Sequence, residues 1–496
     1  MKNFKLKALS FVTVCAMVPL NAMPVSAVNE VTGDFTFDLN AEVYDYGEAI
    51  NEVSFSISSL DKTGLAALEV DKETIDAGTF KIVATSTNPF ATSTGANPSY
   101  GLYTDVERVI EDVKVSSDGK TVSVDLQTKY NGAGQGTLNY VGGTVARNLS
   151  MDITYKVEQL KPFSLTNGTV IKVDSTYKQG KINSLEVEKF SGDSYKGINY
   201  QYYKPTNAND GEKHPLVVWF HGNGEGGYLE AQNNNSQLRA NRGAVSFATD
   251  EAQKIFDGAY VLAPQAPDTW YNNYSNGYIQ KSTEMISKFA AENNVDTDRI
   301  YVYGCSAGGY MTLRMAIENP KLFAAVVANC PAINIAPERG GVVTTQAEIE
   351  SIAQNKLWLV HAADDTTVVP DTSSRWVKSI LKDAIYTEYK NVAIGDVAYP
   401  GHWAWIYSAL NMPKTEAGES LWQWTAKQTL FVEKEPEVKP EVKPEVKPEQ
   451  KPEVKPEQKP IVETSDTTNF GYVSIMGAIS LVSILKLIKR KKEVTE

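Results

Sequence analysis

The sequence predicts an α/β fold with a doubly wound, mostly parallel sheet, preceded by an all-β domain. Between residues 215 and 431, short continuous apolar runs alternate with segments of helical pattern. Runs of this kind form the buried strands of parallel sheets that helices cover on both faces. Upstream, over residues 28–165, short runs of alternating apolar and polar residues are separated by turn residues, which is typical of antiparallel strands. A chain of 496 residues is long enough for two or more domains.

The net charge and the cysteine count argue against two classes of protein, those that bind nucleic acid and those held together by disulfides. The formal net charge of −12 argues against a nucleic-acid partner. The three cysteines are too few for a disulfide framework, and Cys15 falls in a segment that we expect to be removed. We expect Cys305 and Cys330 to be buried free thiols.

Both ends of the chain carry patterns typical of targeting. Residues 1–27 combine an N-terminal basic region, an apolar stretch and the small-residue site Val25-Ser26-Ala27, which predicts a secretory signal peptide and an extracellular location. Residues 433–460 form a four-residue P-E-V-K or P-E-Q-K repeat, which predicts an extended, solvated spacer. Residues 461–496 contain an uncharged, mostly apolar run at 470–485 followed by a basic cluster, which predicts a membrane anchor.

The layout of this C-terminal segment resembles the cell-wall sorting signal of Gram-positive surface proteins. The resemblance implies attachment to the cell wall or membrane of a Gram-positive-type bacterium. Residues 461–466 nevertheless read IVETSD, without the Pro and Gly of the usual Leu-Pro-x-Thr-Gly-like site. Plain membrane anchoring therefore stays open beside sortase processing.

The N-terminal region, residues 28–165, is expected to form an Ig-like β-sandwich. Ser117-Asp118-Gly119 lies between two alternating runs and predicts a hairpin. The region has no histidine and no cluster of catalytic side chains. A spacer role, or contact with a glycan or a partner protein, is more in keeping with this composition than catalysis.

The α/β domain is expected over residues 166–432. The predicted elements are an antiparallel pair at 184–192 and 198–205, strands at 215–220, 258–264, 300–304, 324–329, 357–362 and 387–392, and helices at 278–293, 347–354, 372–382 and 420–431.

A G-x-S-x-G pattern at residues 304–308 lies between a predicted strand and a predicted helix. In that setting the pattern indicates a nucleophile elbow, a tight turn that lifts the hydroxyl of Ser306 out of the sheet. Gly304 and Gly308 lack the Cβ atoms that would clash where the strand and the helix come close.

A serine nucleophile requires a base, and the base requires an orienting carboxylate. Only two of the four histidines follow Ser306. His361 lies in a predicted strand, whereas His402 lies on a Gly-Pro loop after the last strand, where the base is expected. The acid is expected at the preceding strand end, where the spacing of four residues from His361 favours Asp365 over Asp364.

Oxyanion stabilisation and substrate binding are expected from two further stretches. The glycine turn, His221 to Gly227, follows an apolar strand and allows a backbone N–H to approach the substrate, and the N–H of Ala307 is the second expected donor. The stretch 263–271, with Gln265 and Trp270, follows a strand that should open on the active-site edge of the sheet. These two residues and Trp403 are candidate pocket residues, with packing as the alternative.

The joint set of motifs WFHGNGEGG, VLAPQAP, GCSAGGY, HAADDTTVVP and GHW resembles bacterial carboxylesterases of the α/β-hydrolase fold that carry an Ig-like N-terminal domain, near the prolyl-oligopeptidase and feruloyl-esterase-like groups. The resemblance covers most of residues 184–430. It implies Ser306 as nucleophile, Asp365 as acid and His402 as base, with N–H groups of Asn223 and Ala307 binding the oxyanion and no metal or cofactor. The loop after the acid is one residue longer than the usual D-D-P-V-V-P, so Asp364 stays open.

Three functions are compatible with the sequence. The first is a secreted, surface-tethered serine carboxylesterase for esters with short-chain or aromatic acyl groups. The second is a serine peptidase of the prolyl-oligopeptidase type, with the same residues acting on a peptide bond. The third is a non-catalytic surface protein that binds through its N-terminal domain.

Overall fold

The computed structural model describes residues 29–58, 60, 68–88, 99–143, 145–228 and 234–430. The predicted signal peptide (1–27), repeat linker (433–460) and anchor (461–496) lie outside the described residues. Within the described ranges, no helix is both long enough and apolar enough to cross a membrane.

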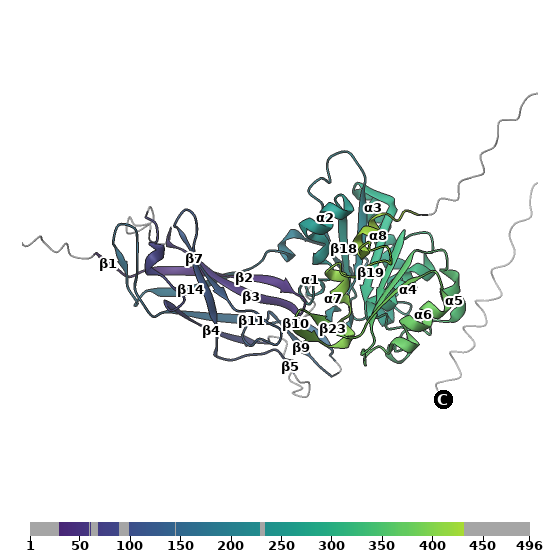
Figure 1. Cartoon of the computed structure of the whole chain (residues 1–496), viewed down its shortest axis with the longest axis horizontal. Helices are drawn as coiled ribbons and strands as arrows, with labels where there is room; N and C mark the ends of the chain where they lie inside the picture. Colours follow the sequence, from purple (N-terminus) through teal and green to yellow (C-terminus); the bar gives the residue numbers. More distant parts are fainter. Residues whose placement is uncertain are drawn as a thin grey trace, which may run out of the picture. The chain divides into compact units, whose positions relative to one another are not determined.

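The α/β domain contains a sheet of eight described strands (Figure 1). Its two antiparallel pairings, between β15 and β16 and between β16 and β18, lie at one edge, and every other neighbouring pair is parallel. This confirms the predicted mostly parallel sheet. In spatial order the strands are β15 (Ser191–Tyr195), β16 (Ile198–Tyr203), β18 (Tyr260–Gln265), β17 (His214–Phe220), β19 (Val295–Cys305), β20 (Ala325–Asn329), β21 (Leu357–Ala362) and β22 (Ile385–Tyr389).

Strand β17 shows why the central strands read as continuous apolar runs. All seven of its residues are buried. Leu216, Val218 and Phe220 pack into one apolar core, whereas Val217 and Trp219 pack into a second core on the other face of the sheet. Because successive side chains of a strand point to opposite faces, a sheet covered on both sides requires apolar residues at every position.

Helices on each face complete these two cores (Figure 1). Buried residues of α3, α4, α5 and α6 contribute to the first core, and those of α2, α7 and α8 contribute to the second. The helices are α1 (Ser236–Arg239), α2 (Asp250–Phe256), α3 (Tyr278–Glu292), α4 (Ala307–Glu318), α5 (Gln346–Ser351), α6 (Ser374–Ile380), α7 (Trp405–Ala409) and α8 (Leu421–Ala426).

Two predicted strands of this domain were wrong in their extent. The first, at 184–192, is interrupted by the short 3-10 helix η3 (Val187–Lys189), and β15 begins only at Ser191. The second, at 387–392, ends in β22 at Tyr389, and a separate hairpin of β23 (Val392–Ile394) and β24 (Val397–Tyr399) follows. Alternating patterns record burial on one face and do not record where strand pairing stops.

The N-terminal region is strand-rich, and its two larger sheets contribute to one apolar core. The Ig-like assignment itself stays a prediction. One sheet contains β14 (Thr176–Ser184), β2 (Asp34–Tyr44), β3 (Gly47–Ser56), β8 (Thr121–Leu126) and β7 (Ile110–Val115), and the other contains β11 (Asp152–Gln159), β4 (Phe80–Thr87) and β6 (Val106–Glu107). Smaller sheets are formed by β10 (Arg147–Ser150), β9 (Leu138–Val141) and β5 (Ser99–Tyr100), and by β1 (Glu30–Val31), β13 (Val170–Ile171) and β12 (Phe163–Ser164).

The hairpin predicted around Ser117-Asp118-Gly119 joins β7 and β8, and Gly119 takes the positive φ of +70° that its turn requires. The boundary predicted after residue 165 was too early. Strand β14, which ends at Ser184, pairs in parallel with β2 and so belongs to the N-terminal sheets.

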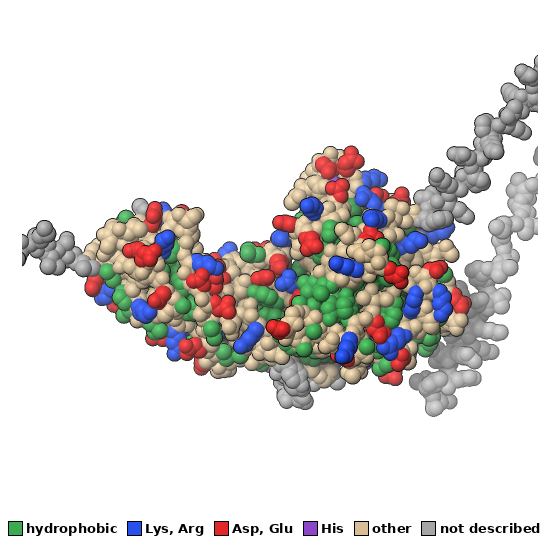
Figure 2. Space-filling view, viewed as in Figure 1, with side chains coloured by type: hydrophobic (Ala, Val, Ile, Leu, Met, Phe, Trp, Pro, Cys, Tyr) green, Lys and Arg blue, Asp and Glu red, His purple; other side chains and the backbone are tan. Residues whose placement is uncertain are grey.

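Charged side chains of both signs are interspersed over the visible face of the described residues (Figure 2). This face therefore offers no continuous basic surface of the kind that binds a phosphate backbone.

Candidate active site

Ser306 lies in the tight turn between β19 and α4, as the G-x-S-x-G pattern predicts. Its backbone has φ +55° and ψ −117°, outside the regions that non-glycine residues ordinarily adopt. Backbone hydrogen bonds hold it there: its N–H donates to the carbonyl of Asn329 (3.0 Å), and its carbonyl accepts from the N–H groups of Tyr310 (2.9 Å) and Ala332 (3.0 Å).

The two flanking glycines allow this turn to pack. A Cβ on Gly304 would lie 2.5 Å from the carbonyl oxygen of Gly308 and from Oγ1 of Thr312. A Cβ on Gly308 would lie 2.0 Å from the carbonyl oxygen of Phe220, at the end of β17. The predicted steric reason for both glycines is thus confirmed by the close approach of helix α4 to the sheet.

The structure brings Ser306, His402 and Asp365 together, although 96 positions separate the first two. The Ser306 hydroxyl lies 2.9 Å from Nε2 of His402, and Nδ1 of His402 lies 2.8 Å from Oδ2 of Asp365. With the proton on Nδ1, His402 donates to the carboxylate and accepts from the serine hydroxyl. This is the arrangement that a base-activated serine requires.

Asp365 is buried and has four hydrogen-bond partners, whereas Asp364 is exposed. Oδ1 of Asp365 accepts from the N–H groups of Thr367 (2.8 Å) and Val368 (2.9 Å). Oδ2 of Asp365 faces both His402 and His361. Burial alone would raise the pKa of Asp365, but the hydrogen bonds from His361 and His402 outweigh it and hold the pKa well below its ordinary value. The carboxylate therefore stays ionised.

His361 has a supporting position that the sequence reasoning did not assign. Its Nε2 lies 3.0 Å from Oδ2 of Asp365 and 2.9 Å from the carbonyl of Val368, and its Nδ1 lies 2.8 Å from Oγ of Ser374. The ring therefore donates to Asp365 and accepts from the serine. The spacing of four residues between His361 and Asp365 was the available signal, since it places both groups at the end of one strand.

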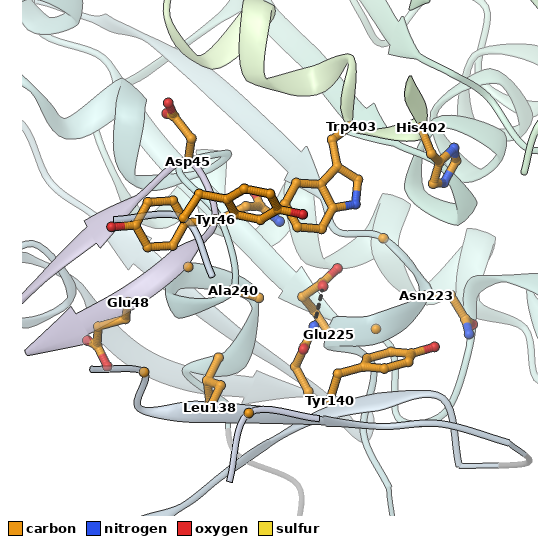
Figure 3. A pocket seen from close by; sticks show the side chains of 18 of the residues that line it. Asp45, Tyr46, Glu48, Leu138, Tyr140, Asn223, Glu225, Ala240, His402 and Trp403 are labelled. Atoms are coloured by element: carbon orange, nitrogen blue, oxygen red, sulfur yellow. Dashed lines mark hydrogen bonds between the residues drawn. The ribbon is translucent and has the colours of Figure 1, made fainter. Parts of the chain in front are cut away.

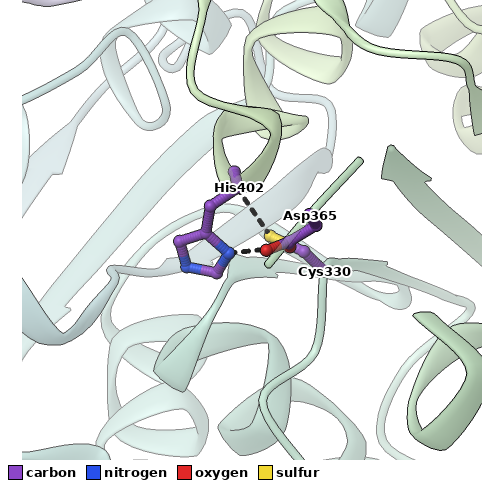
Figure 4. Close-up of side chains that lie close together, drawn as sticks. All are labelled: Cys330, Asp365 and His402. Atoms are coloured by element: carbon purple, nitrogen blue, oxygen red, sulfur yellow. Dashed lines mark hydrogen bonds and ion pairs between the residues drawn. The ribbon is translucent and has the colours of Figure 1, made fainter. Parts of the chain in front are cut away.

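Cys330, Asp365 and His402 place three potential metal-ligand atoms within 4.8 Å of one another (Figure 4). Their chemistry fits a hydrogen-bonded cluster better than a metal site. The Cys330 thiol donates to the carbonyl of His402 (3.3 Å), and burial raises its pKa well above the ordinary value, which disfavours the thiolate that binds metals. Cys305 and Cys330 are both buried and unbridged, as predicted.

The glycine turn lies beside Ser306, and Asn223 begins the short 3-10 helix η4 (Asn223–Glu225). Ala307 is the first residue of α4, so no carbonyl of its own helix can accept its N–H. His221 links the turn to the next strand, because its Nδ1 donates to the carbonyl of Gly222 (2.5 Å) and its Nε2 accepts from the N–H of Ala266 (3.0 Å). Burial lowers the pKa of His221 to about 3, so the ring is neutral.

Beneath this turn the carboxyl group of Glu225 is buried and accepts from Nδ2 of Asn148 (3.0 Å), a residue of β10 (Figure 3). Burial raises the pKa of Glu225 to about 7, although Asn148 and the charge of Arg147 act in the opposite direction. The sequence reasoning missed Arg147, Asn148 and Glu225. No local pattern marks the contacts that join them to the turn, because Arg147 lies 80 positions from Gly227 and Asn148 lies 77 positions from Glu225.

A cavity of about 820 Å³ opens onto Ser306 and His402. Both the α/β domain and the N-terminal region line it, the latter with Tyr46 and Tyr140 among others (Figure 3). Tyr130 of the N-terminal region also lines the cavity. Trp403 lines the cavity, in keeping with its predicted role.

The predicted pocket role was wrong for Gln265 and Trp270. Gln265 is 1% exposed and donates to the carbonyl of Glu225 (3.0 Å) and to Oγ of Ser236 (2.8 Å). Trp270 is fully buried and packs edge-on against Phe220. Neither residue lines the cavity.

The chain is similar to known proteins over the region that contains Ser306. A model of the prolyl oligopeptidase family matches residues 267–337, which include the elbow. Acetylxylan esterase A of Aspergillus ficuum is 27% identical over 225 residues, covering 37% of this chain and 68% of that protein. A poly(3-hydroxybutyrate) depolymerase of Ralstonia pickettii is 27% identical over 181 residues, covering 33% of each protein. The crystal structure of a thermostable esterase is similar with a TM-score of 0.63 and 26% identity, covering 79% of this chain and 99% of that one.

These similarities support two statements about the chain: it has an α/β-hydrolase fold, and it is a serine hydrolase with esterase activity. They confirm the predicted enzyme class.

Replacing Gly308 tests the close approach at the elbow. Alanine ordinarily stabilises a helix relative to glycine, but at this position its Cβ would collide with the carbonyl of Phe220. We expect Gly308→Ala to lower the free energy of unfolding by about 1–3 kcal/mol, measured by urea unfolding. Gly136→Ala is the matched control, since the nearest atom to its Cβ lies 3.6 Å away. Equal stability of Gly308→Ala and wild type would contradict the steric account.

The raised pKa of Glu225 predicts a pH-dependent stability. Between its ordinary pKa of 4.5 and about 7, the folded protein retains a proton that the unfolded chain has lost, so stability falls as pH rises through this window. Glu225→Gln removes this loss. Between about pH 5 and about pH 8, the wild type should lose on the order of 3 kcal/mol more unfolding free energy than Glu225→Gln. Parallel pH profiles of the two proteins in urea unfolding would exclude a buried, titrating Glu225.

Proposed function

We propose that this chain is a serine carboxylesterase in which Ser306 is the nucleophile, His402 the base and Asp365 the carboxylate that orients the base. The observation that carries the proposal is the continuous hydrogen-bonded series from Ser306 through His402 to Asp365, at a cavity that a substrate can enter.

In the proposed reaction the Ser306 hydroxyl oxygen attacks the ester carbonyl carbon while Nε2 of His402 takes the hydroxyl proton. The N–H groups of Asn223 and Ala307 stabilise the negative oxygen of the tetrahedral intermediate. The carbon–oxygen bond to the alcohol then breaks, and His402 returns the proton to the departing oxygen. Water, deprotonated by His402, then attacks the acyl carbon. The bond from that carbon to Oγ of Ser306 breaks, His402 returns the proton to Oγ, and the carboxylic acid leaves.

Asp365 stabilises the imidazolium that forms at His402. Its carboxylate is suited to this role because two backbone N–H groups and His361 fix its position and keep it ionised. Asp364, which is exposed, has no part in the proposed reaction.

The cavity supports a substrate larger than a simple short-chain ester. A volume of about 820 Å³ lies in the range of roughly 300–1,000 Å³ typical of sites for drug-sized molecules. Tyr130 packs edge-on against Trp403 with ring centroids 5.8 Å apart, and Tyr46 lies 6.0 Å from Tyr130. Since Trp403 follows the base that protonates the leaving alcohol, we propose that this aromatic wall contacts an uncharged ring on the alcohol side of the ester. Short-chain and aromatic acyl groups both remain within the proposal.

Location is also part of the proposal. The signal-peptide pattern, the repeat linker and the C-terminal apolar run with its basic cluster support a secreted enzyme tethered to the membrane or cell wall of a Gram-positive-type bacterium. A linker of this composition would hold the catalytic domain away from that surface.

A second candidate is a peptidase of the prolyl-oligopeptidase type, favoured by the family match over residues 267–337. It uses the same three residues, so the bond cleaved separates the candidates. Peptide turnover at least comparable with ester turnover would favour the peptidase.

Ser306→Ala tests the nucleophile. On a panel of p-nitrophenyl and feruloyl esters, we expect kcat to fall by on the order of 10⁶-fold, because the variant lacks the hydroxyl on which the acyl-enzyme forms. Circular dichroism confirms that the variant is folded. Retained turnover in the folded variant would rule out Ser306 as the nucleophile.

Tyr130→Ala tests the aromatic wall with acetate esters that differ only in their alcohol. For 2-naphthyl acetate and an acetylated xylo-oligosaccharide, we expect KM to rise by about tenfold, which corresponds to the loss of one aromatic contact. For ethyl acetate, KM and kcat should not change. Tyr130→Phe keeps the ring and should behave as wild type. The same loss on all three esters would contradict a role in binding the alcohol, and the two ring-bearing esters distinguish an aryl from a glycosyl preference.

A further inference from the structure

Four backbone carbonyls from two parts of the chain converge on the guanidinium of Arg147, the first residue of β10. From the α/β domain, Gly227 accepts from Nε (3.2 Å) and Asp268 accepts from Nη2 (2.5 Å). From the N-terminal region, Val145 (3.3 Å) and Ala146 (3.0 Å) accept from Nη1. One planar group thus fastens the end of the glycine turn to β10, with a fork of donors that no other side chain supplies.

The glycines of the turn make room for these contacts. A Cβ on Gly226 would lie 2.1 Å from the carbonyl oxygen of Asp268 and 3.3 Å from Nε of Arg147. A Cβ on Gly224 would lie 2.8 Å from Nδ2 of Asn148. The turn is therefore glycine-rich on the side that faces β10, and its backbone rests directly on the side chains of that strand.

Because Arg147 and Glu225 are buried, the glycine turn cannot move away from β10 without a large cost in free energy. Arg147 is 7% exposed and Glu225 is 7% exposed. A buried cation and its partners cannot exchange their hydrogen bonds for water, so displacement of the turn leaves polar groups unpaired. Asn148 adds a second attachment through its bond to Glu225, which is the last residue of η4.

We propose that Arg147 and Asn148 are positioning residues for the reaction: they hold the glycine turn, and with it the N–H of Asn223, at the place where the oxyanion forms. The N-terminal region is by this proposal a working part of the active site. The inference rests on the proposed esterase function.

The expected signature is a loss in kcat rather than in KM. Neither residue supplies the nucleophile, the base or the orienting carboxylate. Arg147 acts on the turn through the backbone carbonyl of Gly227, and Asn148 acts on it through the carboxyl group of Glu225. A displaced oxyanion donor weakens binding of the transition state and leaves the ground-state ester little affected. A misplacement of about 1 Å can cost about 100-fold in rate.

Arg239 provides a matched control, because it also joins the two regions but does not bond to the glycine turn. Its Nε lies 2.6 Å from Oε2 of Glu48, and its other nitrogens donate to Oγ of Ser150 (2.9 Å) and the carbonyl of Thr137 (3.3 Å). Loss of Arg239 weakens the same interface without releasing the turn.

The experiment compares Arg147→Met, Arg147→Lys, Asn148→Ala and Arg239→Met in the full chain, with p-nitrophenyl acetate as substrate and thermal unfolding measured alongside. Arg147→Met should lower kcat by about 10- to 100-fold with KM little changed, and Asn148→Ala should lower kcat less. Arg147→Lys keeps the charge but loses the fork, so it should restore only part of the rate. Arg239→Met should lower the unfolding temperature while kcat stays near that of the wild type.

Equal loss of kcat in Arg147→Met and Arg239→Met would overturn the proposal in favour of a general need for the interface, and wild-type kcat in both Arg147→Met and Asn148→Ala would overturn it outright. If Arg147→Met does not fold, Asn148→Ala decides the question, since it removes a single hydrogen bond. Inactivity of Ser306→Ala beside an active wild type establishes the esterase separately, so failure of the two proposals is distinguishable.

Discussion

The active site depends on one steric constraint: helix α4 must begin against the ends of β17 and β19. The absence of Cβ atoms at Gly304 and Gly308 permits that approach, and Ser306 accepts an unfavourable backbone conformation as a consequence. Three backbone hydrogen bonds offset this strain: the Ser306 N–H donates to Asn329, and the Ser306 carbonyl accepts from Tyr310 and Ala332. Helix α4 begins at Ala307, directly after Ser306, so the same turn brings the first N–H of the helix next to the proposed nucleophile in the chain.

Residues with no proposed role in the reaction fix the positions of Asp365, His402 and the glycine turn. His361 and two backbone N–H groups fix Asp365, and Asp365 in turn fixes the tautomer and orientation of His402. On the opposite side, β10 and His221 hold the glycine turn. Arg147, His221 and His361 are buried, which strengthens their electrostatic interactions and makes their displacement costly.

The central sheet and the three residues of the proposed triad could be predicted from the sequence, for physical reasons. Continuous apolar runs predicted the central parallel sheet because both faces of β17 are covered. The scarcity of histidine singled out His402, and spacing favoured Asp365, because strand ends and loop positions follow from chain order in a parallel sheet.

The contribution of the N-terminal region to the site could not be predicted from the sequence. Arg147 and Asn148 meet their partners 80 and 77 positions further along the chain, and no periodicity encodes such a contact. Trp270 was misassigned because an aromatic residue near a strand end fits a core as well as a pocket, and burial distinguishes the two.

The most direct measurement is acid-quenched trapping of the acyl-enzyme, followed by mass spectrometry of its peptides. During turnover of a p-nitrophenyl ester, the peptide that contains Ser306 should gain the mass of the acyl group, and a burst of p-nitrophenol should match the amount of enzyme. Ester hydrolysis with the acyl group on another residue, or with no covalent adduct and no burst, would contradict nucleophilic catalysis by Ser306.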